Sequence, residues 1–359
     1  MLTQLFFEQS IGFGLLFGEF LLAALLVFFL SMKLTGFADF LERNSGLSDV
    51  WIGMLLLAFI TSLPEAVSSI GSTFIDGAIN LGVSNLAGSN MFNIVIIVIL
   101  DLVQGPGPIL LLIKDHQVFI VAGGILLMAL VGCAIALHIP FAGLDAPGRF
   151  TGIFFSIIII VAFLVITWFL SNREKLEPCS ASKTLKKNSL VAGSLRKPVL
   201  LFSLTSVFVI IASVWLLGTC DALARQPVTI GENSFQLSHT FVGAFFVAIV
   251  TSLPELFVSL GALRLGQVNM SIANIFGSNI INMGFIPIMH LFAGHASFYA
   301  SISPLSVVML FTSIIMSTLF ITGLLIHSKR SFCYLGWEVT LILATYGCAT
   351  YLLLSIGIL

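Results

Sequence analysis

The stretch Thr61-Ser62-Leu63-Pro64-Glu65 interrupts an apolar run, WIGMLLLAFITSLPEAVSSIG, at residues 51–71. Proline removes a backbone N–H and bends a helix, and a glutamate is costly to place among apolar residues. The same five residues recur as Thr251-Ser252-Leu253-Pro254-Glu255. Because a proline bend and a glutamate charge occur side by side in two separate apolar runs, we expect the bend and the charge to act together.

The repeat extends beyond these five residues. Four further pairs match at the same offset: Gly53 with Gly243, Ala58 with Ala248, Ser69 with Ser259, and Gly71 with Gly261. Downstream, NLGVSNLAGSNMFN at 80–93 matches NMSIANIFGSNIIN at 269–282, with one residue deleted between the two blocks. The chain therefore contains two copies of one polar unit, which we place at 53–94 and 243–283.

The composition predicts a membrane protein. Apolar residues make up 58% of the chain and charged residues only 9%, whereas soluble domains have about 25% charged residues. The net charge of −1 gives no reason to expect a nucleic-acid partner. The five cysteines form no CxxC pair, so we interpret them as small apolar residues within helices.

Apolar runs of about 20 residues are long enough to cross a bilayer as helices. We place ten, near residues 11–33, 49–74, 79–104, 117–139, 149–171, 198–222, 239–263, 268–293, 302–327 and 334–356. The second, third, seventh and eighth carry the repeated polar motifs. These spans divide the chain into a first half at 1–171 and a second half at 198–359.

The basic linker at 172–197 predicts the orientation. It holds seven of the fifteen Lys and Arg residues, and positively charged loops stay in the cytoplasm. Ten spans then put both termini outside, with thirteen Lys and Arg residues inside and only Arg149 and Arg225 outside. The linker is too short to fold as a regulatory domain, which favours a prokaryotic plasma (inner) membrane.

Each half has five spans, and because five is odd the halves enter the membrane in opposite senses. The predicted fold class is all-α integral membrane, with ten transmembrane helices as two inverted five-helix repeats. This is the plan of many secondary transporters, in which polar broken helices meet near the midplane.

The repeated motifs supply oxygen ligands. On a helix, Thr61 and Ser62 share a face with Glu65, and Ser89 lies four residues before Asn93. The second half offers the equivalent set Thr251, Ser252, Glu255, Ser278 and Asn282. Oxygen ligands without thiol or imidazole suit Ca²⁺ or Na⁺, and two carboxylates balance one divalent charge.

These motifs resemble those of the sodium/calcium exchanger branch of the cation/Ca²⁺ antiporter superfamily. The hallmark of that branch is a pair of inverted repeats, each with a TS-x-PE helix followed by a GSN-x-x-N helix. The resemblance covers essentially the whole chain. It implies four cation sites between the second, third, seventh and eighth helices, and a first and sixth helix that slide as a unit across the other eight.

The resemblance also implies roles for individual residues. Glu65 and Glu255 are expected to bind Ca²⁺ at the centre, with Thr61, Ser62, Ser89, Asn93, Thr251, Ser252, Ser278 and Asn282 as further side-chain ligands. Ala58 and Ala248 are expected to give backbone carbonyls to outer Na⁺ sites. The family glycine before TS is replaced by Ile60 and Val250, which is expected to stiffen the bend and puts the carbonyl assignments in question.

The preferred function is an antiporter that exchanges Na⁺ for Ca²⁺ by alternating access. The main alternative is H⁺/Ca²⁺ exchange on the same scaffold, although such relatives usually show GNAAE-like motifs. Asn282 stands where potassium-dependent members have Asp, so we expect no potassium cotransport. No paired aspartates or HExxH helix of an intramembrane protease occur, and inverted broken helices favour a carrier over a channel. We therefore expect no enzyme activity, no cofactor, and a monomer whose substrates are Ca²⁺ and Na⁺.

Several other ionisable residues lie nearer the ends of the predicted spans. Glu19, Asp101, Asp221 and Glu338 are expected at the membrane interface. His138 and His290 also lie near span ends, and no ligand role is expected for either.

Overall fold

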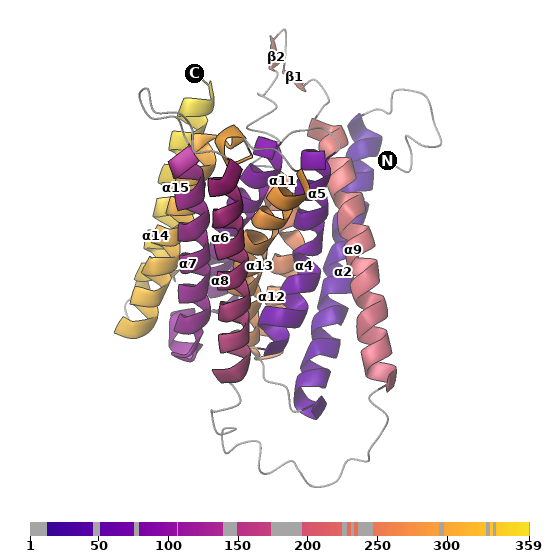
Figure 1. Cartoon of the computed structure of the whole chain (residues 1–359). Helices are drawn as coiled ribbons and strands as arrows, with labels where there is room; N and C mark the ends of the chain where they lie inside the picture. The colour runs from indigo at the N-terminus through magenta and orange to yellow at the C-terminus, as the bar shows by residue number, and fades with distance from the viewer. Residues whose placement is uncertain are drawn as a thin grey trace.

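The structure is a computed structural model that describes residues 13–45, 51–74, 79–105, 107–138, 149–173, 196–224, 228–230, 233–235, 247–293, 298–327, 331–332 and 335–358. Over these ranges the chain is almost entirely helical. The residues run as a bundle of long helices that lie roughly side by side (Figure 1). The basic linker between residues 174 and 195 and Gly243 of the second repeat lie outside the described residues.

In the first half the helical elements are α2 (Phe13–Ser45), the π-helix η1 (Ile52–Leu57), α4 (Ala58–Thr61), α5 (Leu63–Phe74), α6 (Ile79–Gln104), the 3₁₀ turn η2 (Ile109–Leu112), α7 (Gln117–His138) and α8 (Arg149–Arg173). In the second half they are α9 (Arg196–Ala224), α11 (Val247–Thr251), α12 (Leu253–Arg264), α13 (Val268–Ala293), the 3₁₀ turn η5 (Tyr299–Ser301), α14 (Pro304–Ile326) and α15 (Trp337–Ile358). Two short antiparallel strand pairs lie between helices in the chain. β1 (Val228–Ile230) pairs with β2 (Asn233–Phe235) between α9 and α11, and β3 (Ser331–Phe332) pairs with β4 (Leu335–Gly336) between α14 and α15.

The predicted helical membrane fold is confirmed. Within the described residues, seven helices are long and apolar enough to cross a membrane, and the bent pair Ile52–Thr61 with Leu63–Thr73 makes an eighth. α15 contains a shorter apolar stretch, Trp337–Leu353. The second broken helix is described only from Val247, so the count of ten stays a prediction.

The two broken helices run in opposite directions. In Figure 1, α5 lies above α4, whereas α12 lies below α11. Since α5 follows α4 and α12 follows α11 in the chain, the two TSLPE segments are antiparallel. The first residues of α2 and the last of α15 lie at the same end of the bundle in this view.

The GSN helices form the centre of the bundle. The most apolar window of α13 is 89% buried and that of α6 is 78% buried, against 17% for α8. The main apolar core gathers side chains from α6, α7, α13, α14 and α15, such as Leu86, Ile94, Phe276, Phe320 and Val339. The polar residues of the GSN motifs on α6 and α13 are therefore buried among other helices.

The helix pair α2 and α9 is held separately from this core. None of the described residues of α2 or α9 belongs to the main core; instead two smaller clusters join them to each other and to the broken helices, through Ala23, Val27, Leu34, Val209 and Leu216 among others. Near one end, Trp215 Nε1 donates a hydrogen bond of 2.7 Å to Glu19 Oε1. The α2–α9 pair is thus packed as a unit against the rest of the bundle.

The first span is longer than predicted. We placed it at 11–33, but α2 continues to Ser45. Hydropathy falls after Lys33, yet Leu34, Ala38 and Leu41 recur at helical spacing and are all buried. An amphipathic stripe of this kind packs against neighbouring helices without being apolar all round, which is why a count of apolar residues missed it.

Asp101 and Glu338 are 0% and 3% exposed, so both are buried within the protein; their predicted place at the membrane interface stays a prediction. Asp101 Oδ1 accepts a hydrogen bond from Ile109 N at 2.6 Å, and Oδ2 accepts one from Gly336 N at 2.8 Å. The carboxylate thereby ties two connecting segments to the end of α6. Glu338 fills space beside Gly323, where a Cβ would lie only 2.7 Å from Glu338 Cγ. The side chain of Asp221 lies outside the described residues.

Candidate functional site

Both TSLPE helices break at the serine. α4 ends at Thr61 and α5 begins at Leu63, and the axes of Ile52–Thr61 and Leu63–Thr73 differ by 43°. Ser62 has φ −82° and ψ −3°, and Ser252 has φ −86° and ψ 4°. These values lie in the sparsely populated bridge region, which residues other than glycine also occupy. The helices therefore break with Ile60 and Val250 in place of the family glycine.

Pro64 and Pro254 each lie two residues after these serines and contribute no N–H to the helix. A helix interrupted in this way leaves a carbonyl one turn earlier without its usual partner. Glu65 and Glu255, each one residue after a proline, are both 0% exposed.

Each serine of one repeat contacts the glutamate of the other. Ser62 Oγ donates to Glu255 Oε1 at 3.3 Å, and Ser252 Oγ donates to Glu65 Oε1 at 3.2 Å. Ser278 Oγ also donates to Glu255 Oε1 at 3.4 Å. The two broken helices therefore meet, and each carboxylate is held by the opposite repeat.

The threonines and GSN serines form a second reciprocal pair of contacts. Thr61 Oγ1 lies 3.5 Å from Ser278 Oγ, and Thr251 Oγ1 lies 3.3 Å from Ser89 Oγ. Every hydroxyl in these contacts comes from a residue with at most 2% exposure. Hydroxyl oxygens carry lone pairs as well as a donor, so each can also coordinate a cation.

The two alanine carbonyls accept hydrogen bonds from these hydroxyls. Ala248 O accepts from Thr251 Oγ1 at 3.2 Å and from Ser89 Oγ at 3.4 Å. Ala58 O accepts from Thr61 Oγ1 at 3.3 Å. Both carbonyls are therefore within reach of site hydroxyls; their expected role as ligands of outer Na⁺ sites stays a prediction.

A crossed pair of asparagines, which sequence reasoning missed, joins α6 to α13. Asn90 Nδ2 donates to Asn279 O at 3.2 Å, and Asn279 Nδ2 donates to Asn90 O at 3.3 Å. Asn279 Oδ1 accepts a hydrogen bond from Asn93 Nδ2, and Asn90 Oδ1 accepts one from Asn282 Nδ2, each at 3.0 Å. The signal was available, because the last Asn of Gly-Ser-Asn occurs in both repeats without an assigned role.

Among the predicted site residues, four buried oxygens have no hydrogen-bond partner in the described part of the chain: Glu65 Oε2, Glu255 Oε2, Asn93 Oδ1 and Asn282 Oδ1. Buried acceptors without a partner are uncommon and unfavourable. In the part of the chain that the structure describes, no ion pair involves either glutamate. The four oxygens are chemically suited to a hard cation.

Close backbone packing holds the helices at this distance. A Cβ at Gly277 would lie 2.8 Å from Met54 Cα and 3.0 Å from Ala58 Cβ. Asn274 Nδ2 donates to Ser259 Oγ, and the equivalent Asn85 Nδ2 donates to Ser69 Oγ, both at 3.0 Å. Each GSN helix is thus tied to the broken helix of its own repeat.

The structure brings all the sequence-predicted site residues into this buried region of the bundle. They are 0–2% exposed and comprise Ala58, Thr61, Ser62, Glu65, Ser89, Asn93, Ala248, Thr251, Ser252, Glu255, Ser278 and Asn282. The hydrogen bonds above connect them directly or through Asn90 and Asn279.

Comparison with known proteins agrees with this arrangement. The model of the family described as sodium/calcium exchanger protein matches residues 15–172 and 199–355. The chain is 24% identical over 323 residues to the sodium/calcium exchanger MaX1 of Methanosarcina acetivorans, covering 84% of this chain and 86% of that protein. It is 25% identical over 270 residues to the inner membrane protein YrbG of Escherichia coli, covering 72% and 74%.

Solved structures share the fold. Superposition on the sodium-calcium exchanger NCX_Mj gives a TM-score of 0.67 with 21% identity, over 94% of this chain and 98% of that one. A structure of the sodium/calcium exchanger from Methanococcus jannaschii gives a TM-score of 0.63 with 22% identity, over 95% and 99%.

Proposed function

Because the chain belongs to the sodium/calcium exchanger protein family, and is therefore an integral membrane cation/Ca²⁺ exchanger, we propose that Na⁺ is the ion it exchanges for Ca²⁺. In this proposal the two ions use one buried site at the meeting point of the two repeats. Ca²⁺ is held mainly by Glu65 and Glu255. Na⁺ uses the same carboxylates together with the surrounding neutral oxygens.

The observation that carries the proposal is the set of four buried oxygens without a partner. A proton needs only the two carboxylates, which can bind it directly. Na⁺ needs further neutral oxygens, and the amide oxygens of Asn93 and Asn282 are available for that role. This donor set supports Na⁺ as the coupling ion.

The remaining ligands follow from the hydrogen bonds. The hydroxyls of Thr61, Ser62, Thr251 and Ser252 donate to carbonyls or carboxylates in the structure. Each can rotate to present a lone pair when a cation enters. Ser89 and Ser278 would do the same from α6 and α13, and the carbonyls of Ala58 and Ala248 would complete outer Na⁺ positions.

Alternating access would come from the α2–α9 pair. It contacts the broken helices through its own apolar clusters rather than through the main core. Sliding of that pair could uncover the site from either side while α6 and α13 stay packed. The two proposed halves, 1–171 and 198–359, would each contribute one helix to the moving unit.

Ion flux into proteoliposomes tests the coupling ion. Vesicles loaded with Na⁺ are expected to take up Ca²⁺ at constant pH without K⁺. If more than two Na⁺ leave for each Ca²⁺ that enters, positive charge leaves the vesicle. An inside-positive potential should then speed the uptake, and an inside-negative potential should slow it. Uptake that follows a pH gradient and ignores Na⁺ would establish H⁺/Ca²⁺ exchange instead.

The orientation is part of the proposal. We place the 172–197 linker in the cytoplasm of a prokaryotic cell and both termini outside, on the distribution of Lys and Arg. A cysteine introduced at 180–195, in a variant without the native cysteines, should react with an impermeant thiol reagent only from the cytoplasmic side. Reaction from outside would overturn the orientation while leaving the site unaffected.

A further inference from the structure

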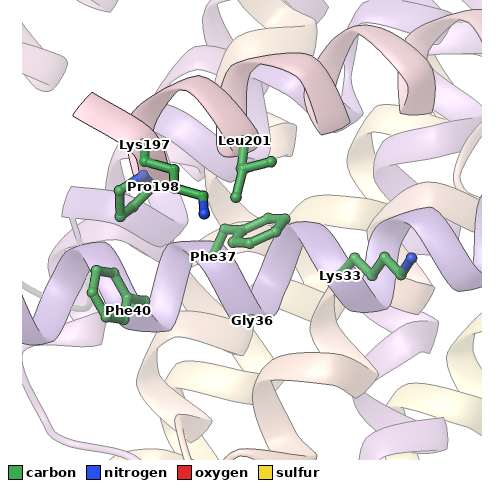
Figure 2. A pocket seen from close by; sticks show the side chains of 7 residues that line it. All are labelled: Lys33, Gly36, Phe37, Phe40, Lys197, Pro198 and Leu201. Atoms are coloured by element: carbon green, nitrogen blue, oxygen red, sulfur yellow. The ribbon is translucent and has the colours of Figure 1, made fainter. Parts of the chain in front are cut away.

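Charged side chains away from the central site converge at one end of α6 but not in the crevice between α2 and α9. That crevice has a volume of about 570 Å³, and its two lysines, Lys33 and Lys197, extend away from each other (Figure 2). At the end of α6, by contrast, Asp101 of α6 and Glu338 of α15 both border Gly336. Two carboxyl groups from distant parts of the chain therefore come together there.

Gly336 defines how close the two carboxyl groups are. Its N–H donates to Asp101 Oδ2 at 2.8 Å, and a Cβ on this glycine would lie 3.7 Å from Glu338 Oε2. The two carboxylates are close enough to repel each other when both are ionised. Like charges that are held together in a buried place need a compensating positive charge.

The two carboxyl groups differ in how well their oxygens are satisfied. Asp101 accepts backbone N–H groups from Ile109 and Gly336. Neither oxygen of Glu338 has a hydrogen-bond partner in the described part of the chain, although the side chain of Trp337 lies close by. Glu338 is only 3% exposed. A buried carboxylate in this condition is unfavourable unless it binds a cation or a proton.

The end of α6 adds further oxygen donors. Gln104 lies one turn after Asp101, and its buried Oε1 also has no hydrogen-bond partner among the described residues. α6 ends at Gln104, and the last carbonyls of a helix carry the negative end of its dipole. In the described ranges no ion pair involves Asp101 or Glu338. Oxygen donors of this kind suit a hard cation.

Close packing holds Glu338 in place. A Cβ on Gly323 of α14 would lie 2.7 Å from Glu338 Cγ and 2.7 Å from Leu110 Cδ1. The stem of Glu338 therefore packs directly on the backbone of α14, which has room for it because position 323 is a glycine. A Cβ on Gly336 would likewise lie 3.2 Å from Pro108 Cβ. Groups that are fixed before a ligand arrives lose little entropy on binding it.

We propose that Asp101 and Glu338 bind a Ca²⁺ ion, with the Gln104 amide oxygen as a further ligand. Two carboxylates balance the divalent charge, and Ca²⁺ tolerates irregular oxygen ligands better than Mg²⁺ does. The ion would join the end of α6 to the start of α15 and would be structural, not transported. It would belong to this end alone, because His290 stands at the position equivalent to Asp101 in the second repeat.

Thermal unfolding of the purified full chain tests the proposal in the variant E65Q/E255Q, which removes the two central carboxylates. About 1 mM Ca²⁺ should raise its unfolding midpoint by about 5 °C, as expected for a ligand at roughly 100 times its dissociation constant. Adding E338Q should abolish the rise. In chelator, the E338Q variant should unfold at or above the midpoint of its parent, because the amide carries no unpaired charge. Adding D115N, the matched control, should leave the rise intact.

Terbium luminescence locates the ion. Tb³⁺ takes the oxygen ligands of Ca²⁺ and luminesces when a nearby tryptophan passes excitation energy to it. Bound to E65Q/E255Q, it should give a signal that Ca²⁺ displaces and that E338Q removes. W337F should lower this signal about threefold or more, because Trp337 adjoins Glu338 in the chain. W168F, which changes a tryptophan that is 67% exposed on α8, should leave the signal unchanged.

Three outcomes would overturn the proposal. One is a full Ca²⁺-induced rise that persists with E338Q. Another is the absence of both the rise and the terbium signal in E65Q/E255Q, which is the result if Glu338 is protonated. The third is a rise with Mg²⁺ but not with Ca²⁺. Normal Ca²⁺ uptake by E65Q/E255Q would contradict the proposed transport site instead, and the comparison with and without E338Q would still decide this second site.

Discussion

The two repeats match at the centre of the bundle and differ at the ends of their GSN helices. Asn93 and Asn282 are equivalent, and both leave an amide oxygen without a partner. Eight residues further along, the equivalent positions hold Asp101 in one repeat and His290 in the other. Both side chains are buried, so the difference concerns their contacts rather than their depth.

The buried side chains at the two helix ends, Asp101 and His290, make different kinds of hydrogen bond. Asp101 accepts backbone N–H groups from Ile109 and Gly336. His290 Nδ1 instead lies 2.7 Å from Ser156 Oγ, which lies 2.8 Å from the hydroxyl of Tyr299. The centre keeps one set of oxygens in both copies, which is the pattern expected if a shared ligand constrains it. The ends are constrained only by their own connecting segments.

The largest expected effect tests whether the two carboxylates are equivalent. E65Q and E255Q should each lower Ca²⁺ uptake into proteoliposomes by about 100-fold or more, because each removes one of two charges that balance a divalent ion. Both variants should elute as folded protein on size-exclusion chromatography. D115N, which alters a carboxylate whose side chain is 66% exposed, is the matched control. Near-normal uptake by either glutamine variant would contradict the central assignment.

The crossed asparagines sharpen the comparison, because they position ligands without being assigned as ligands. N90A removes the oxygen that accepts from Asn282, and N279A removes the one that accepts from Asn93. Each should raise the Ca²⁺ concentration for half-maximal uptake about tenfold, as is typical when a group that orients a ligand is lost. The two effects should agree within a few-fold. A loss of maximal rate with unchanged half-saturation would argue against a positioning role.

Close packing at the site should affect stability rather than ion choice. G277A places a methyl group 2.8–3.0 Å from Met54 and Ala58, and overpacking of this kind costs about 1–3 kcal/mol of unfolding free energy. G132A is the control, since a Cβ there would find nothing within 4 Å. Heating followed by size-exclusion chromatography should show a lower midpoint for G277A only. Equal thermal midpoints for G277A and G132A would mean that α13 can move to accommodate the methyl group without loss of unfolding free energy.

The smallest effects should occur at the ends. D101N turns one acceptor toward a backbone N–H into an NH₂ group and should cost about 1–3 kcal/mol. S156A loses two side-chain contacts and should cost about 1 kcal/mol. Both variants should retain Na⁺-dependent Ca²⁺ uptake once reconstituted. Loss of uptake in a folded D101N variant would show that the ends are not merely structural.

Much of the fold and of the candidate site could be predicted, because the repeated sequence motifs specify them directly. Two copies of TSLPE and GSN implied both the antiparallel broken helices and the oxygens that meet between them. What could not be predicted depends on partners distant in the chain. Asp101 accepts one of its two backbone hydrogen bonds from Gly336, which is 235 residues away, and no local pattern indicates that contact. The extension of α2 was missed for a similar reason, since its buried stripe has meaning only against other helices.

Equilibrium binding of radioactive Ca²⁺ to the purified chain tests the central claim most directly. The claim is that oxygens from both repeats form one site used by Ca²⁺ and Na⁺. At fixed pH, Na⁺ should displace bound Ca²⁺ with a Hill coefficient above 1. The double variant N93A/N282A should require about tenfold more Na⁺, because two neutral ligands are lost, while displacement by protons stays unchanged. Displacement by protons alone, with Na⁺ without effect on the wild type, would contradict the account.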